Sequence, residues 1–200
     1  MPSGVGRRIR YIQTMAKLNN IFNSTVTAFL LAICFCGSAA AQSDVLDRLF
    51  DELAEAPPEN VDRIEGQIQT AWDKSGSPAM DLLLRRGKEA MDEGDPEAAV
   101  DHFTALIDHA PDFAEGYNAR ATAFYVMGMI GPALDDIRNA LRLNPRHFGA
   151  LRGLGIILEE IERPEDALMV YREIAKLNPN GDTVFDGIER LTLELEGRSL

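Results

Sequence analysis

Residues 151–179 read LRGLGIILEEIERPEDALMVYREIAKLNP, and this stretch decides the fold. Apolar residues recur at helical spacing in two runs, on either side of a short polar segment. Pro164 suits the first turn of a helix, where its missing N–H has no partner to lose. Pro179 ends the second run, because proline cannot continue a helix. The stretch therefore predicts a helix, a turn and a second helix.

The same pattern recurs upstream at a fixed interval. Pro111, Pro145 and Pro179 follow one another at steps of 34 residues. Three further sets of positions keep this register: Ala99, Ala133 and Ala167; Phe103, Ile137 and Tyr171; Leu83, Tyr117 and Leu151. A period of this length is typical of a protein built from stacked repeats.

Capping residues place the helices within each repeat. Ser77 is a suitable N-cap before Pro78, and Gly94 is a suitable helix end. Asp95 can cap the next helix, with Pro96 in its first turn. No segment of this region alternates with the period of a strand. The repeats are therefore predicted to be all-α.

These positions resemble the tetratricopeptide repeat (TPR) family, whose motif is W-x2-L-G-x2-Y, then A-x3-F, then a closing proline. The last copy matches best, through Leu151, Leu154, Gly155, Leu158, Ala167, Tyr171 and Pro179. Arg120 and Arg86 replace the motif's leucine in the two earlier copies. The resemblance implies a right-handed superhelical solenoid of helix-turn-helix repeats, in which the first helix of each repeat lines a concave groove.

The period divides the chain into segments. Three TPR repeats are expected within 78–181, at 78–111, 112–145 and 146–179. Residues 42–77 contain two amphipathic stretches that we interpret as a degenerate repeat completing the stack. Residues 182–200 are expected to form a capping helix at the other end.

Small residues recur where the two helices of a repeat would cross. They are Gly87, Ala121 and Gly155 on the first helix and Ala99, Ala133 and Ala167 on the second. A larger side chain at these places would force the helix axes apart.

The first 41 residues have the composition of a secretory signal. Their basic residues are Arg7, Arg8, Arg10 and Lys17, and no acidic residue precedes Asp44. The apolar run 26–41 follows and ends in three alanines. This pattern predicts a signal peptide cleaved between Ala41 and Gln42, in an exported protein of bacterial type. The expected location is periplasmic or secreted, with no stable membrane insertion after cleavage.

Two alternatives to this interpretation stay open. An uncleaved segment would anchor the protein in a membrane, although a spanning helix needs about 20 apolar residues and the run is shorter. Translation could also begin at Met15, since MAKLNN is a suitable opening for a shorter signal. Cys34 and Cys36 both lie in the apolar run, so the remainder has no thiol for a disulfide or a metal site.

The charge of the chain excludes some partners. The sequence has 20 basic and 32 acidic residues, and four of the basic but none of the acidic ones precede Asp44. The remainder carries 16 basic and 32 acidic residues, a net charge of −16. Such a surface repels nucleic acid and anionic lipid headgroups.

No catalytic, cofactor or metal site is predicted. The glycines of 142–155 lack the spacing and the preceding strand of a nucleotide-binding loop. His147 is expected at the start of a helix, packed against the previous repeat. His102 and His109 would be about 10 Å apart along one helix, too far to share a metal ion. An enzyme is the least favoured class.

The predicted groove is the remaining candidate site. Helical spacing places seven residues on it: Leu84, Lys88, Asn118, Thr122, Tyr125, Arg152 and Ile156. Two cations beside polar and apolar groups suit an extended peptide or a carboxylate-bearing tail. The alternative is that these are merely exposed helix positions. We interpret the protein as an adaptor for a protein or peptide partner, in envelope assembly or maintenance; the rival hypothesis is a structural subunit held through its terminal helices.

Overall fold

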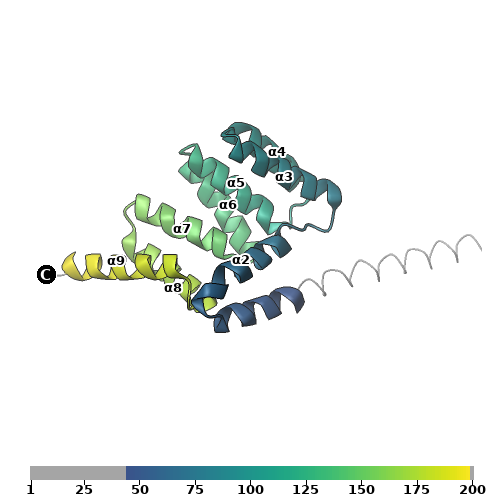
Figure 1. The fold of residues 1–200 in the computed structure, drawn as a ribbon. Helices are drawn as coiled ribbons and strands as arrows, with labels where there is room; N and C mark the ends of the chain where they lie inside the picture. Colours follow the sequence, from purple (N-terminus) through teal and green to yellow (C-terminus); the bar gives the residue numbers. More distant parts are fainter. Residues whose placement is uncertain (1–43, 199–200) are drawn as a thin grey trace, which may run out of the picture. The chain divides into compact units, whose positions relative to one another are not determined.

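Residues 44–198 are described by a computed structural model, and every regular element among them is a helix (Figure 1). Residues 44–55 form the helix that precedes the labelled ones. The others are α2 (Pro58–Trp72), α3 (Pro78–Asp92), α4 (Pro96–His109), α5 (Ala114–Val126), α6 (Ile130–Leu143), α7 (Phe148–Glu160), α8 (Pro164–Leu177) and α9 (Asp182–Arg198). The all-α fold predicted from the period is confirmed.

The predicted signal segment, with Ala41 and Gln42, lies outside the described residues. Within residues 44–198 none of the helices combines the length and the apolar character needed to cross a membrane. The helices discussed below belong to one compact unit, Leu46–Leu200.

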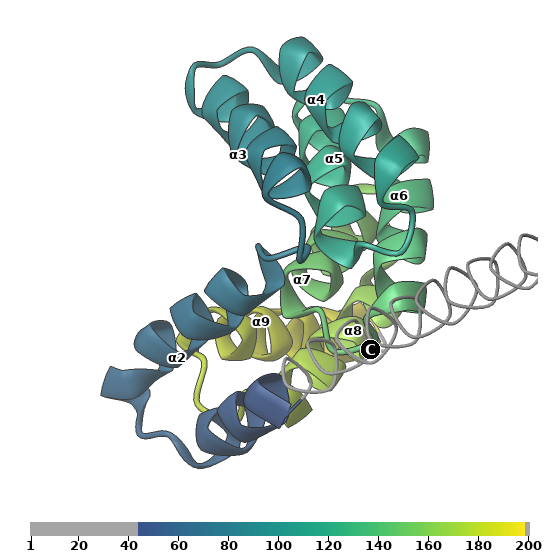
Figure 2. The same cartoon turned by 90° about the vertical axis from the view of Figure 1, so that its right-hand side faces the viewer.

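The repeats stack in chain order. Helices α3 and α4, α5 and α6, and α7 and α8 pack together as pairs, and α4 contacts α5 while α6 contacts α7 (Figure 2). Helix α9 packs on α8, as expected of a capping helix. The turns inside the first two pairs contain Gly94 and Gly128 at positive φ, and Glu162 takes the equivalent place in the third.

Small residues lie where the paired helices cross, as the period predicts. Gly87 of α3 contacts the ring of Phe103 in α4, and Gly155 of α7 contacts the ring of Tyr171 in α8. A Cβ atom added at either glycine would overlap that ring. Ala121 and Ala133 are buried in the core shared by α5 and α6. In the first and third repeats, therefore, the aromatic ring of the second helix fills the space that a side chain on the first would need.

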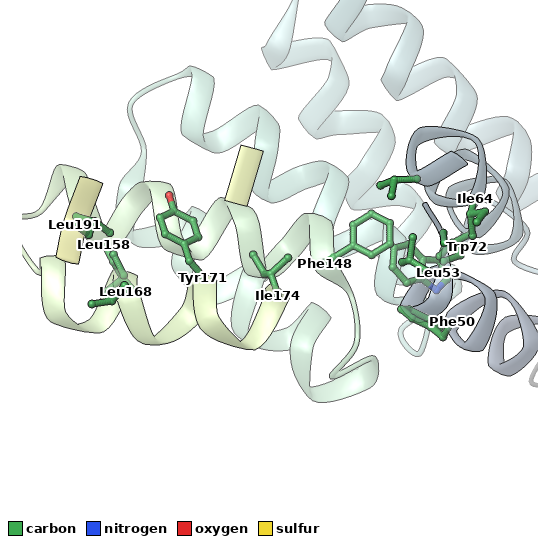
Figure 3. Packing of buried hydrophobic residues seen from close by; sticks show 14 residues of the cluster. Phe50, Leu53, Ile64, Trp72, Phe148, Leu158, Leu168, Tyr171, Ile174 and Leu191 are labelled. Atoms are coloured by element: carbon green, nitrogen blue, oxygen red, sulfur yellow. The ribbon is translucent and has the colours of Figure 1, made fainter. Parts of the chain in front are cut away.

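The N-terminal helices pack in a place that the sequence did not indicate. Their apolar face includes Phe50, Leu53, Ile64 and Trp72, and it joins a core cluster with Phe148 (Figure 3). Toward α8 and α9 the same cluster continues through Ile174, Tyr171 and Leu191. The core cluster of α3 and α4 contains none of the residues described in 44–72. The apolar face of the pair therefore packs against the last repeat and not against the first. The origin of the pair as a degenerate repeat stays a prediction.

We expect Gly87→Ala to lower the free energy of unfolding by about 1–2 kcal/mol. The overlap with Phe103 is an overpacking cost that exceeds the gain of about 1 kcal/mol in helix propensity. The matched control is Gly66→Ala in α2, where an added Cβ meets nothing within 4 Å and the variant should be more stable by up to about 1 kcal/mol. Urea denaturation followed by circular dichroism measures the free energy of unfolding of both variants. If both changed in the same direction, the claim that Phe103 occupies the space beside Gly87 would be contradicted.

Candidate functional site

Five of the seven predicted groove residues line one cavity between α5 and α7. These are Asn118, Thr122, Tyr125, Arg152 and Ile156. The cavity has a volume of about 380 Å³, and its wall is completed by Ala121, Val126, Ile137, Gly149, Gly153 and Ile157. We call it the α5/α7 cavity. Its residues come from the first helices of two consecutive repeats, with Ile137 of α6 behind them.

The α5/α7 cavity has a predominantly apolar wall. Ala121, Ile137 and Ile157 are buried and form its inner part. Val126 and Ile156 are 61% and 42% exposed at its opening. Because exposed aliphatic side chains beside a cavity lower their free energy when a partner covers them, this opening suits an apolar side chain of another molecule.

Leu84 is not part of a groove, which corrects the sequence-based expectation. Its side chain is only 2% exposed and belongs to the core cluster that contains Phe103 and Leu106. A leucine buried in this core cannot also contact a peptide. Its helical spacing alone did not distinguish the buried face from the groove face.

Lys88 is already paired within the chain. Its Nζ lies 2.7 Å from Oδ1 of Asp73, the residue that follows α2, and 3.1 Å from Oε1 of Glu115 in α5. Burial by itself lowers the pKa of Lys88, but the carboxylates of Glu115 and Asp73 outweigh it and raise that pKa. The ammonium group therefore joins α3 to α5 and to the end of α2.

Glu115 is the buried centre of this polar cluster. The residue is 3% exposed, and Oε1 accepts a hydrogen bond from Gln69 at 3.0 Å. Oε2 contacts Asn118 at 3.3 Å and Nε2 of His147 at 3.0 Å. Burial alone would raise the pKa of Glu115, but the hydrogen bond from His147 and the charge of Lys88 lower it below its ordinary value of 4.5.

His147 joins the cluster from the start of α7. Its Nδ1 accepts a hydrogen bond from the backbone N–H of Ala150, so the ring proton lies on Nε2 and is donated to Glu115. The residue is fully buried, and its ring stacks on Trp72 with centroids 4.2 Å apart. The prediction that His147 starts a helix and packs against the previous repeat is confirmed.

Arg152 faces another carboxylate of α2. Its Nη2 lies 3.7 Å from Oε2 of Glu65, and its guanidinium carbon lies 5.9 Å from the centre of the Phe148 ring. Glu65 also accepts a hydrogen bond from Asn178. The buried Nε of Arg152 has no hydrogen-bond partner within residues 44–198. Both cations predicted to bind a carboxylate thus have an acidic residue of α2 or its C-cap beside them.

A carboxylate also lies at the Tyr125 end of the α5/α7 cavity. Partial desolvation and the nearby Glu160 carboxylate raise the pKa of Tyr125. Glu160 itself is exposed at the end of α7. The accessible charge at this end is therefore negative.

The departures from the family motif have different structural outcomes. Arg120, in place of the motif's leucine, makes paired hydrogen bonds of 2.7 and 2.9 Å to Asp136 and a third to Thr104. Arg86 is exposed. The described residues contain no group of three or more side chains that could hold a metal ion.

The TPR family model matches residues 84–129 and 130–182. A TPR repeat-containing protein of Rhizobium etli is 33% identical over 153 residues, which cover 76% of this chain and 75% of that protein. The chain belongs to the tetratricopeptide repeat family. The TPR chain is also 26% identical over 119 residues to Hsp70-Hsp90 organizing protein 1 of Glycine max; the match covers 60% of this chain but only 21% of that protein.

A solved structure shows the same fold. The first TPR of Spaghetti (RPAP3), bound to the HSP90 peptide SRMEEVD, matches with a TM-score of 0.56 and 21% identity. The match covers 58% of this TPR chain and 93% of that chain. This likeness supports the solenoid fold.

We expect Glu115→Gln to lower the free energy of unfolding at neutral pH by about 1–3 kcal/mol, because charge-assisted hydrogen bonds to Lys88 and His147 are weakened. Since the pKa of Glu115 is lower in the folded state, its contribution is complete above pH 4.5 and is lost as the pH falls through the folded-state value. The difference between wild type and variant should therefore shrink at acidic pH.

Denaturation followed by the fluorescence of Trp72, the only tryptophan, measures this difference directly at the cluster. The control is Asp135→Asn, which removes an exposed carboxylate paired with Arg138 and should change stability little. A difference between wild type and Glu115→Gln that is independent of pH would contradict the assigned role of the charge.

Proposed function

We propose that this protein is an adaptor that binds a protein or peptide segment in the α5/α7 cavity. The observation that carries the proposal is an open apolar cavity of about 380 Å³ on the first helices of consecutive repeats, with Val126 and Ile156 exposed at its opening. The TPR structure bound to an HSP90 peptide and the relative named Hsp70-Hsp90 organizing protein 1 support a role in binding a protein or peptide. Catalysis is not part of the proposal.

Two titratable side chains near the cavity are already engaged in the fold, which leaves apolar contact as the main source of binding energy. Glu115 and His147 are buried and hydrogen-bonded to each other and to the helices around them. Groups held in this way stabilise the joint between repeats and are not exposed to a ligand. The energy of binding then comes mainly from covering apolar side chains.

A charge introduced at the cavity opening tests this function. We expect Val126→Asp combined with Ile156→Asp to reduce partner capture at least about tenfold, because two carboxylates would be desolvated in an apolar contact. The measurement is affinity capture on the immobilised protein with quantitative mass spectrometry. Circular dichroism checks that the variant stays helical.

The matched control is Met169→Asp combined with Leu193→Asp, which charges two exposed apolar residues outside the cavity. Capture that survives the cavity variant but is lost in this control would contradict the proposed site. That outcome favours the second candidate function, a subunit held through its terminal helices. The specific observation for it is the exposed apolar surface of α9, where Phe185 and Leu193 are 42% and 63% exposed.

We also propose that the protein is exported and acts in the periplasm or outside the cell, in envelope assembly or maintenance. The support is the composition of residues 1–41, with a basic start, an apolar run and three alanines before Gln42. When residues 1–200 are expressed in a bacterium, N-terminal sequencing should find that the protein begins at Gln42. A chain that still begins at Met1 or Met15 would instead indicate a membrane anchor.

A further inference from the structure

We propose that the α5/α7 cavity selects an apolar side chain flanked by lysine or arginine and rejects acidic chain ends. This inference rests on the proposed function and specifies the chemistry of the partner. It follows from the positions of the charged residues around the cavity, where the basic side chains already have acidic partners in the same chain.

The cations on this surface are neutralised by carboxylates of the same chain. Lys88 lies within 3.1 Å of Glu115 and within 2.7 Å of Asp73. An incoming carboxylate would have to displace Asp73, or come to rest beside the buried charge of Glu115. Either arrangement is unfavourable, because like charges in a partly buried site repel each other strongly.

Arg152 lies farther from its carboxylate than Lys88 does from its own. This longer distance indicates which group Arg152 can bind. Glu65 lies 3.7 Å from its Nη2, which supplies the opposite charge at a distance too long for a hydrogen bond. The buried Nε of the same guanidinium has no hydrogen-bond partner among the described residues. The Arg152 side chain is 37% exposed, so an accessible N–H of the guanidinium can donate to a main-chain carbonyl of a bound segment, which adds no second negative charge beside Glu65.

The far end of the cavity favours a cation. Glu160 is exposed beside Tyr125, which lines the cavity. Val126 and Ile156 provide the apolar contact nearby. A residue with a positive charge next to an apolar side chain can therefore place one group in the cavity and the other against Glu160. The net charge of −16 after residue 43 adds to this preference at long range.

Selection of a random peptide display library on the immobilised full chain tests the inference. The informative peptides are those that lose binding to the Val126→Asp, Ile156→Asp variant. Among them, lysine and arginine should be enriched about threefold over aspartate and glutamate relative to the library, the size expected of one exposed charge pair. A Glu160→Gln variant should lower this enrichment.

Removing the α2 carboxylates provides the reverse test. In a Glu65→Gln, Asp73→Asn variant, Arg152 loses its acidic neighbour and Lys88 keeps only Glu115. Acidic peptides should then bind several-fold better than to wild type. The matched control is Glu52→Gln combined with Asp135→Asn, which removes two carboxylates from exposed ion pairs elsewhere and should leave the selected peptides unchanged.

The outcomes separate the two proposals. Cavity-dependent peptides that are acidic, or that need a free C-terminal carboxylate, would overturn the inference while leaving the proposed function intact. No change in the α2 variant would contradict the role given to Glu65 and Asp73. A library without any cavity-dependent peptide would overturn the proposed function itself.

Discussion

A single buried carboxylate, Glu115, connects the parts of this structure that the repeat period does not connect. Its partners come from three other helices: Lys88 from α3, Gln69 from α2 and His147 from the start of α7. A charge this deeply buried is tolerated only while it keeps its hydrogen bonds and its opposite charge. The relative positions of the three repeats are therefore coupled to one side chain.

This coupling changes how the solenoid can deform. In a simple repeat array each unit contacts only its neighbours, so bending can accumulate from one repeat to the next. Here Trp72 stacks on His147 while Asp73, directly after it, pairs with Lys88. The end of α2 thus contacts the third and the first repeat at once. We infer that the surface between them is held in one shape and is largely formed before a partner binds.

The helix crossings could be predicted from the sequence, because they follow the 34-residue period. The ion pairs that depend on the position of α2 could not. Gly155 could be placed at a helix crossing because small residues recur in register with an aromatic partner such as Tyr171. The pairing of Lys88 and Arg152 with α2 could not, since no spacing relates Asp73 or Glu65 to them. Those contacts depend on where α2 packs in the folded protein. That position is determined by the burial of Trp72 and its apolar neighbours, which is a tertiary contact that no repeat spacing predicts.

The matched cations also limit how tightly the cavity can bind. Covering one aliphatic side chain contributes about 1.5–3 kcal/mol, whereas even millimolar affinity corresponds to about 4 kcal/mol. Lys88 and Arg152 already have acidic partners in the chain. A charged group of the partner therefore adds little binding free energy to that of the covered side chain. A partner held by the cavity alone would therefore exchange rapidly. Stable association therefore requires that the partner cover more than one apolar side chain of this surface.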